Sequence, residues 1–444
     1  MTLLRRCLLA LFILVAAPVQ AAGDSGWFYR GSDIAPDPAW TFGTLPNGLR
    51  YAIRRNPMPE GQVSIRLRIA AGSLHERDEE RGWAHFIEHM AFRGTKNFAD
   101  HEARETWQRL GASFGSDTNA STEPTQTVYR LDLPRADQAG IDQSLKIIAD
   151  MADTALFDPA VVNAERGVVL SELGRRTELS NRWDELTRGL FFSGLTFANR
   201  DPIGTEETLK AANPEGLRGY YERWYRPERA TLIVVGDADP ALVERLIAAR
   251  FGGWKGTGPA PREPDYGSIA QVPERTGTLV YAGAPHIAQL TWLRPYRAEP
   301  NTKAKERTEL ARALAARIIS RRLTAKARTG AAFVSADIAS DQATNIADLT
   351  QISINPKEGR WKEALAEAYA IVADALRAPP SETEIQREME NLRTAARAGL
   401  EAEPTQKSQQ LAERLLSAID EGGVISSAKV RLELLEELAP AMTP

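Results

Sequence analysis

The 444-residue chain is poor in cysteine and histidine, with one cysteine, Cys7, and five histidines. One cysteine forms no disulfide within the chain, and Cys7 lies in a segment that we expect to be removed. The mature protein would then hold no thiol, which suits an oxidising compartment without requiring disulfides. The chain also lacks an excess of positive charge, and its formal net charge of −4 argues against nucleic acid as a main partner.

The chain has no apolar run long enough to predict a membrane span at its N-terminus. Arg5 and Arg6 precede an apolar stretch that ends near Val19, and Val19-Gln20-Ala21 resembles a small-residue cleavage site. This pattern predicts a signal peptide over residues 1–21, with an uncleaved anchor as the alternative. Cys7 precedes the apolar region, so it does not fit lipid attachment. We therefore expect a periplasmic protein.

The stretch His85-Phe86-Ile87-Glu88-His89 carries the clearest chemical signal in the sequence. On a helix, positions i, i+3 and i+4 lie on one side, so both imidazoles and the carboxylate would point into one space. A zinc hydrolase needs two neutral nitrogen ligands and a general base beside them. The order H-x-x-E-H is the inverzincin motif. The alternative is a helix that carries two histidines by coincidence.

Catalytic zinc usually takes three protein ligands, so one more residue is required. Glu165 and Glu172 are two helical turns apart in a segment that we predict to be helical, so they share one face. Either carboxylate could reach the metal. The alternative is that both are solvated helix glutamates, as most glutamates are.

The chain resembles the pitrilysin/insulinase family of zinc metallopeptidases, which includes the mitochondrial processing peptidases. The resemblance covers most of residues 41–240. The matching segments, in the family's order, are GWAHFIEHMAFRGT at 82–95, NAST at 119–122, the glutamate pair at 165–172, PIGT at 202–205, WYRP at 224–227 and VGD at 235–237.

The resemblance implies a role for each residue of the motif. His85, His89 and Glu172 would bind one zinc ion per chain, and Glu88 would be the catalytic base. Glu165 would assist catalysis by orienting a histidine, because such a partner fixes the ring tautomer and the ligand geometry.

Residues Asn119-Ala120-Ser121-Thr122 are the candidate substrate contact. The resemblance makes them an edge strand that pairs with the peptide main chain, so Asn119 and Ala120 would bind substrate. From the residues alone, a polar turn is the alternative, because serine, threonine and aspartate cluster between positions 113 and 122.

The order of predicted elements favours an α+β fold with two tandem, structurally repeated domains. Each would be a mainly antiparallel sheet with helices packed on one face. After the signal peptide we expect a leader (22–40), a catalytic domain (41–252), a linker rich in glycine and proline (253–275) and a non-catalytic homologous domain (276–444). The second repeat looks truncated at its C-terminus.

Several elements can be placed by their pattern. Residues 63–69 alternate apolar and polar side chains, which predicts a half-buried strand. Residues 45–53 predict a hairpin with Asn47-Gly48 as its turn. The remaining predicted strands are 127–133, 230–235, 278–280, 289–292 and 350–354. The predicted helices are 137–157, 159–178, 215–224, 304–327, 358–377 and 381–400.

Together these features predict an exported zinc endopeptidase acting on short or unfolded peptides, with Glu88 moving the proton from water to the leaving amine. The resemblance implies a second clamshell half, supplied by a C-terminal continuation or by a partner subunit. The rival hypotheses are a non-catalytic subunit that binds peptides or assembles a complex, and a zinc-binding protein without catalysis. The intact motif argues against the first rival.

Overall fold

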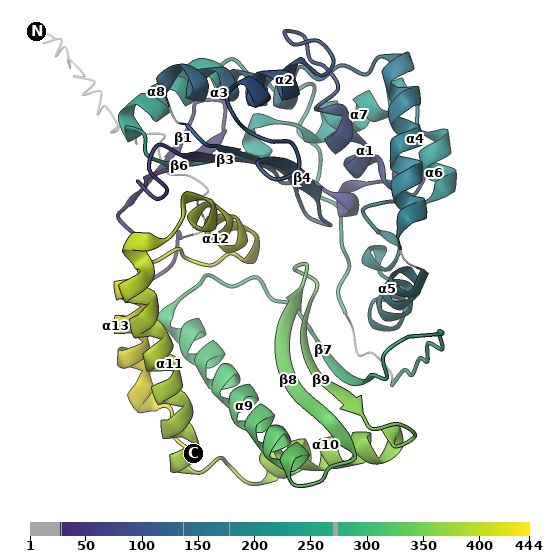
Figure 1. The fold of residues 1–444 in the computed structure, drawn as a ribbon, viewed down its shortest axis with the longest axis vertical. Helices are drawn as coiled ribbons and strands as arrows, with labels where there is room; N and C mark the ends of the chain where they lie inside the picture. The colour runs from purple at the N-terminus through teal and green to yellow at the C-terminus, as the bar shows by residue number, and fades with distance from the viewer. Residues whose placement is uncertain (1–26, 28, 136, 177, 270–273) are drawn as a thin grey trace, which may run out of the picture.

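The computed structural model describes residues 27, 29–135, 137–176, 178–269 and 274–444 (Figure 1). The predicted signal peptide lies outside the described residues. Within the described part of the chain, none of the helices combines the length and apolarity that crossing a membrane requires.

The first half is built on a six-stranded sheet in the order β1-β2-β6-β3-β5-β4. All pairings are antiparallel except that of β2 with β6. The mainly antiparallel sheet of the prediction is therefore confirmed. The strands are β1 Trp40–Thr44, β2 Arg50–Arg55, β3 Val63–Ile69, β4 Thr118–Thr122, β5 Thr127–Leu133 and β6 Ala230–Gly236.

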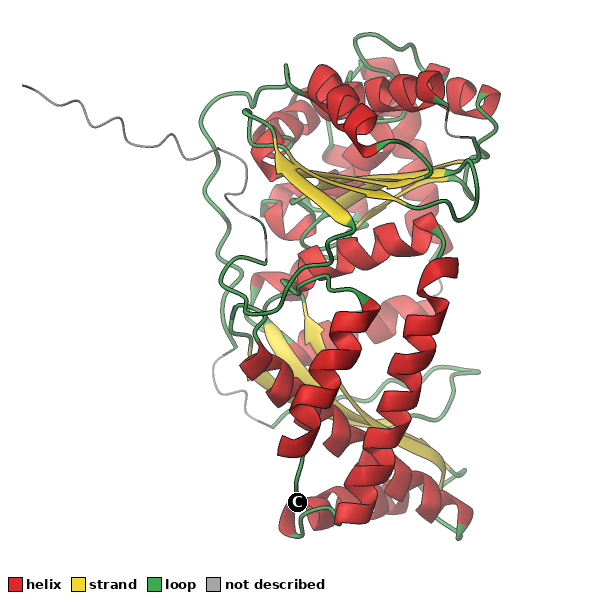
Figure 2. Ribbon diagram, turned by 90° about the vertical axis from the view of Figure 1, so that its left-hand side faces the viewer, coloured by secondary structure: helices red, strands yellow, loops and turns green. Residues whose placement is uncertain are grey.

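Helices cover one face of this sheet and enclose the main hydrophobic core (Figures 1 and 2). Their starts follow from local chemistry. Asp158 accepts backbone N–H groups at the start of α4, and Pro159 takes the first position, where no N–H partner is needed. The helices of this half are α1 Trp83–Met90, α2 Glu102–Arg109, α3 Gln138–Asp153, α4 Pro159–Arg175, α5 Glu178–Phe191, α6 Glu206–Ala211, α7 Pro214–Trp224 and α8 Pro240–Phe251.

The opposite face of the first sheet is covered by α12 (Ser408–Glu421), which comes from the second half of the chain. Leu411 and Leu415 of α12 pack against Ile233 and Val235 of β6. The prediction of a half-buried β3 is therefore wrong, because every residue of this strand is buried. The polar side chains of β3 face α12, and Arg66 bonds to Glu413 there at 2.7 Å.

The second half contains a three-stranded antiparallel sheet in the order β7-β9-β8, formed by Ala288–Pro295, Ala347–Pro356 and Phe333–Ala343. Helices α9 (Lys303–Arg328) and α10 (Trp361–Arg377) share a core with this sheet. Two further helices, α11 (Glu382–Ala402) and α13 (Ala428–Leu438), lie beside α9 and α12 (Figure 1). The prediction of two α+β units with helix-backed sheets is thus confirmed.

One predicted strand of the second half is wrong. Residues 278–280 are not in a strand, and Val280 is 88% exposed. The short apolar run pairs with no strand, so its backbone does not join the sheet, whose edge is β7. The described residues between α8 and β7 form neither helix nor strand.

Candidate metal centre and substrate cleft

Helix α1 is held in position by the burial of its apolar side chains. Phe86, Ile87 and Met90 are fully buried against the sheet, which turns the histidines and Glu88 away from that core. The helix follows Gly82, whose φ of +87° is in the left-handed region that favours glycine. The carboxylate of Glu76 accepts the N–H groups of Gly82 and Ala84 at 3.1 and 2.9 Å, which holds the start of the helix.

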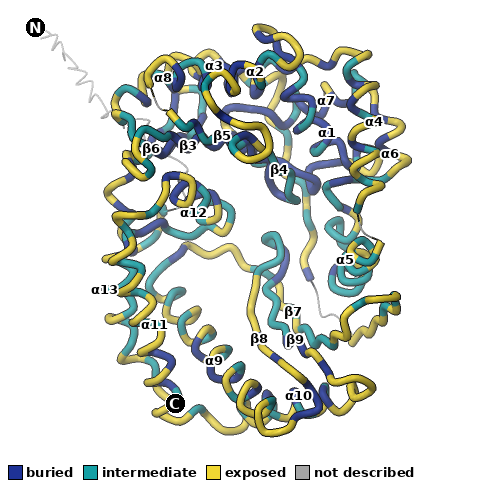
Figure 3. The backbone as a smooth tube through the Cα atoms, viewed as in Figure 1, coloured by how far each residue is buried: buried dark blue, intermediate teal, exposed yellow. Residues whose placement is uncertain are grey.

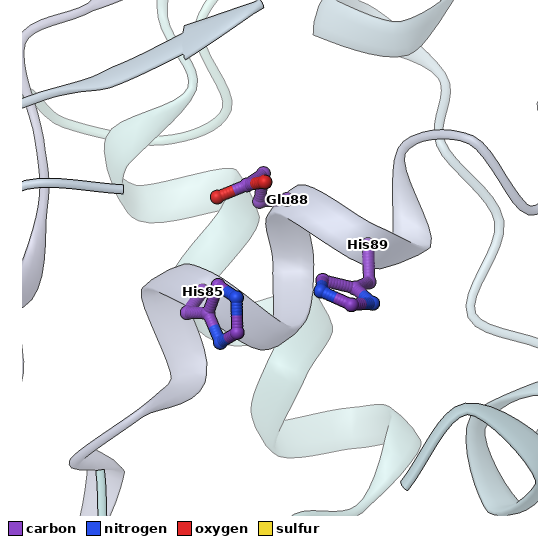
Figure 4. Close-up of side chains that lie close together, drawn as sticks. All are labelled: His85, Glu88 and His89. Atoms are coloured by element: carbon purple, nitrogen blue, oxygen red, sulfur yellow. The ribbon is translucent and has the colours of Figure 1, made fainter. Parts of the chain in front are cut away.

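His85, Glu88 and His89 lie close together on α1 (Figure 4). One ligand atom from each lies within 4.8 Å of the others. Glu172 of α4 faces the two imidazoles, with Oε1 at 3.7 Å from His85 Nε2 and Oε2 at 3.5 Å from His89 Nε2. The structure thus brings together the four residues that the sequence singled out for metal binding and proton transfer. Their roles stay predictions.

Glu165 lies on the far side of the His89 ring. Its Oε1 is 2.8 Å from His89 Nδ1, so this nitrogen carries the proton and Nε2 is left to face Glu172. Glu165 is buried, whereas the side chain of Glu172 is 47% exposed. The geometry therefore separates the two carboxylates: Glu172 faces both Nε2 atoms, and Glu165 bonds to the nitrogen behind.

The donors present fit a zinc ion by their chemistry. Two imidazole nitrogens and one carboxylate oxygen form a common catalytic zinc set, which leaves a position for water. The bond from His89 Nδ1 to a carboxylate is the usual partner of a metal-binding histidine.

The pKa values of the titratable groups at the centre are shifted in different directions. Burial lowers the pKa of His85 to about 4, and the neighbouring His89 adds to that effect. Burial also lowers the pKa of His89, but hydrogen bonds to Glu165 and Glu172 outweigh it and raise the value to about 9. Burial raises the pKa of Glu88 to about 7, although a hydrogen bond from Thr122 opposes the shift. A carboxylate with a pKa near neutrality suits proton transfer.

Two residues to which the sequence analysis gave no role at the metal centre support these groups. Thr122 Oγ1 donates to Glu88 Oε2 at 2.6 Å and so ties the end of β4 to α1. Arg93 contacts Glu165 and also bonds to both carboxylate oxygens of Asp100, at 2.9 and 3.0 Å. Arg93 comes after the end of α1, so helical spacing alone could not have identified it.

A cleft of about 760 Å³ runs over the centre. Asn119 and Ala120 line it from β4, the outermost strand of the sheet. The polar-turn alternative for this segment is therefore wrong, and the strand has one edge that no other described strand pairs. Asn119 Oδ1 accepts the backbone N–H of Ala120 at 2.8 Å. The cleft is also lined by Phe92, Arg93, Arg104, Phe114, Ser121, Val168, Arg176, Asp201, Pro202 and Ile203.

Comparison with known proteins identifies the family of the chain. Residues 51–188 match the insulinase (peptidase family M16) model, and residues 211–392 match the peptidase M16 inactive domain. The chain belongs to the insulinase family. Family members named "Probable zinc protease PqqL" are 39% identical over 205 residues in Escherichia coli and 34% identical over 238 residues in Haemophilus influenzae.

These matches cover 46% and 54% of the chain but only 22% and 26% of the two relatives. The matched part therefore spans about a quarter of their length. Among solved M16 structures, the first half of the periplasmic protease PqqL from Escherichia coli is 25% identical with a TM-score of 0.83, covering 92% of this chain and 88% of that one. In the whole PqqL structure (24% identical, TM-score 0.84), the match covers 45% of that chain.

Proposed function

We propose that the protein is an exported, zinc-dependent endopeptidase that hydrolyses short or unfolded peptides. The observation that carries the proposal is the arrangement of His85, His89 and Glu172 around one space, with Glu88 beside it in an open cleft. Membership of a peptidase family whose relatives are named zinc proteases adds independent support.

In this proposal His85, His89 and Glu172 hold one zinc ion per chain. When bound, zinc lowers the pKa of water and polarises a peptide carbonyl. Glu88 accepts the proton of the attacking water and passes it to the nitrogen of the leaving amine. Glu165 acts by holding His89 in one orientation and tautomer, and Arg93 fixes Glu165 in turn.

The open edge of β4 suggests how a peptide binds. An extended peptide can add to such an edge by main-chain hydrogen bonds, which here would involve the backbone of Asn119 and Ala120. Short or unfolded peptides can adopt the extended conformation that such pairing requires, which favours them as substrates. Thr122 connects this strand to Glu88, so the peptide would bind next to the base.

Two parts of the proposal concern the surroundings of the chain. A second clamshell half, either a continuation of the chain or a partner subunit, would face the cleft, since the chain matches 45% of the whole PqqL structure. The periplasm is the proposed location, because residues 1–21 have a signal-peptide pattern and the matched structures are of a periplasmic protease.

A zinc-dependent peptidase assay tests the proposal. The protein, expressed from its complete reading frame, should contain zinc and cleave a mixture of quenched fluorescent peptides. A chelator should abolish cleavage, and added zinc should restore it. Zinc content without any cleavage would favour the non-catalytic peptide-binding or assembly subunit. Absence of bound zinc at micromolar metal would reject the metal centre itself.

A further inference from the structure

Arg104 of α2 is a cleft residue that the proposed reaction does not use. Its guanidinium carbon lies 4.1 Å from the centre of the Phe114 ring and 5.8 Å from that of Phe92. The two rings meet edge to face at 6.2 Å. An arginine over aromatic faces is held in place while its charge stays available.

Within the described part of the chain, Arg104 forms no ion pair, and its buried Nε has no hydrogen-bond partner. The residue as a whole is only part-buried and lines the cleft, so its terminal N–H groups can meet a carboxylate there. Burial lowers the pKa of Arg104, although Glu165 and Asp100 act in the opposite direction. Both carboxylates are already bound by Arg93 and so do not neutralise Arg104.

The other arginines in the cleft differ from Arg104. Arg93 is paired as described, and Arg176 bonds to Asp201 at 2.8 Å. Of the three arginines that line the cleft, Arg104 is thus the one whose charge the described residues leave unmatched. It also lies beside the proposed peptide strand, because Phe114 bridges to Thr118, the first residue of β4.

We propose that Arg104, braced by Phe92 and Phe114, binds a carboxylate of the peptide substrate and so selects acidic peptides. The inference rests on the proposed peptidase function and specifies its substrate class. Guanidinium and carboxylate form charge-assisted hydrogen bonds with matching geometry, which would match the charge that the described residues leave unpaired. Phe114 is 50% exposed, so it can offer apolar contact to the methylene groups of a glutamate.

Peptide binding to the zinc-loaded Glu88→Gln protein tests this inference without turnover. The probes are fluorescent, C-terminally amidated peptides of one sequence in which a single glutamate is moved through each position. Matched sets carry glutamine or lysine instead. At one position, glutamate should bind at least about tenfold more tightly than glutamine, the value of one charge-assisted hydrogen bond. A peptide with a free C-terminus and no glutamate shows whether a terminal carboxylate serves equally.

Substitutions of Arg104 connect the preference to this residue. Arg104→Gln should equalise glutamate and glutamine, and Arg104→Glu should favour lysine. Arg104→Lys, which keeps the charge but not the planar fork, should leave part of the preference and guards against a folding defect. The matched control is Arg109→Gln, on the same helix but 63% exposed and away from the cleft, which should keep the full preference.

The outcomes separate this inference from the proposed function. An equal affinity for glutamate and glutamine at every position, or a preference that survives in Arg104→Gln, would overturn the inference even if the wild type cleaves peptides. A preference lost only in the Arg104 variants would support it even if hydrolysis were absent. Failure of all peptides to bind would overturn it as well.

Discussion

The two sheets of the molecule differ in how far they are enclosed. In the first, both faces of the central strand β3 are covered, by the helical layer on one side and by α12 on the other. In the second, β8 alternates between buried residues such as Ile338 and exposed ones such as Val334 (Figure 3). The half with the enclosed sheet holds the candidate metal centre, on helices α1 and α4, and the half with the half-covered sheet shows no such group among the described residues.

The helices of the two halves differ in the same way. Helix α1 buries its apolar side chains and leaves histidines facing a cleft. Helix α10 instead exposes Trp361, Tyr369 and Leu376, and the histidine of the second half, His286, is exposed. A similar architecture is therefore not sufficient for a metal centre, which requires particular side chains that face a cleft.

The largest expected difference between the halves is catalytic. Glu88→Gln should lower kcat by about 10²–10⁴-fold, because the proposed general base is lost. Bound zinc should remain, since the variant keeps all three proposed ligands, and elemental analysis checks this. The matched control is Glu363→Gln in α10, which is exposed and should leave kcat unchanged. Near-normal turnover in Glu88→Gln would remove Glu88 as the base.

The next effect concerns stability. Arg66 is fully buried between Asp132 at 2.9 Å and Glu413 of α12 at 2.7 Å. Arg66→Met should lower the free energy of unfolding by about 1–3 kcal/mol, because it removes the charged hydrogen bonds of a fully buried guanidinium to Asp132 and Glu413. Denaturant unfolding measures the change.

The exposed pair of Arg360 and Glu363 in the second half provides the comparison. Arg360→Met should change the free energy of unfolding by less than about 1 kcal/mol, as exposed ion pairs do. Equal effects of Arg66→Met and Arg360→Met would show that α12 does not enclose the first sheet in solution.

A smaller difference is expected between the two glutamates of α4. Glu165→Ala should weaken zinc binding by about 10–100-fold, the usual cost of losing a residue that orients a ligand. Glu172→Ala should weaken it further, because this carboxylate faces both Nε2 atoms. Zinc competition against a chromophoric chelator ranks the two variants. The reverse order would exchange the proposed roles.

The smallest effect tests the open side of the second half. Leu376 is 83% exposed, so Leu376→Ser should change the free energy of unfolding by no more than about 0.5 kcal/mol. Truncation of a leucine in the core of the first half, Leu232→Ala, should lower the free energy of unfolding by about 2–5 kcal/mol. A large loss for Leu376→Ser, seen in thermal unfolding, would mean that another surface covers α10 in solution.

Much of the site could be predicted because its signals are local. The spacing of His85, Glu88 and His89 fixes their common side on any helix, and the interval between Glu165 and Glu172 does the same on α4. The strand at Asn119–Thr122 was not predictable from its composition, which is typical of a turn, and came only from the family resemblance. The strand predicted at 278–280 is wrong, because a short apolar pattern does not show whether a partner strand exists.

The sequence by itself determined which side chains can share a helix face, since helical geometry depends only on residue spacing. Tertiary structure decided which of the two glutamates faces the imidazoles, and to which nitrogen of His89 the carboxylate of Glu165 bonds. It also decided that Arg104 has no acidic partner within the described part of the chain. It also decided that both faces of β3 are buried, because Arg66 meets Glu413 across 347 residues of chain. Contacts between residues so distant in sequence leave no local pattern, and only packing of the whole chain creates them.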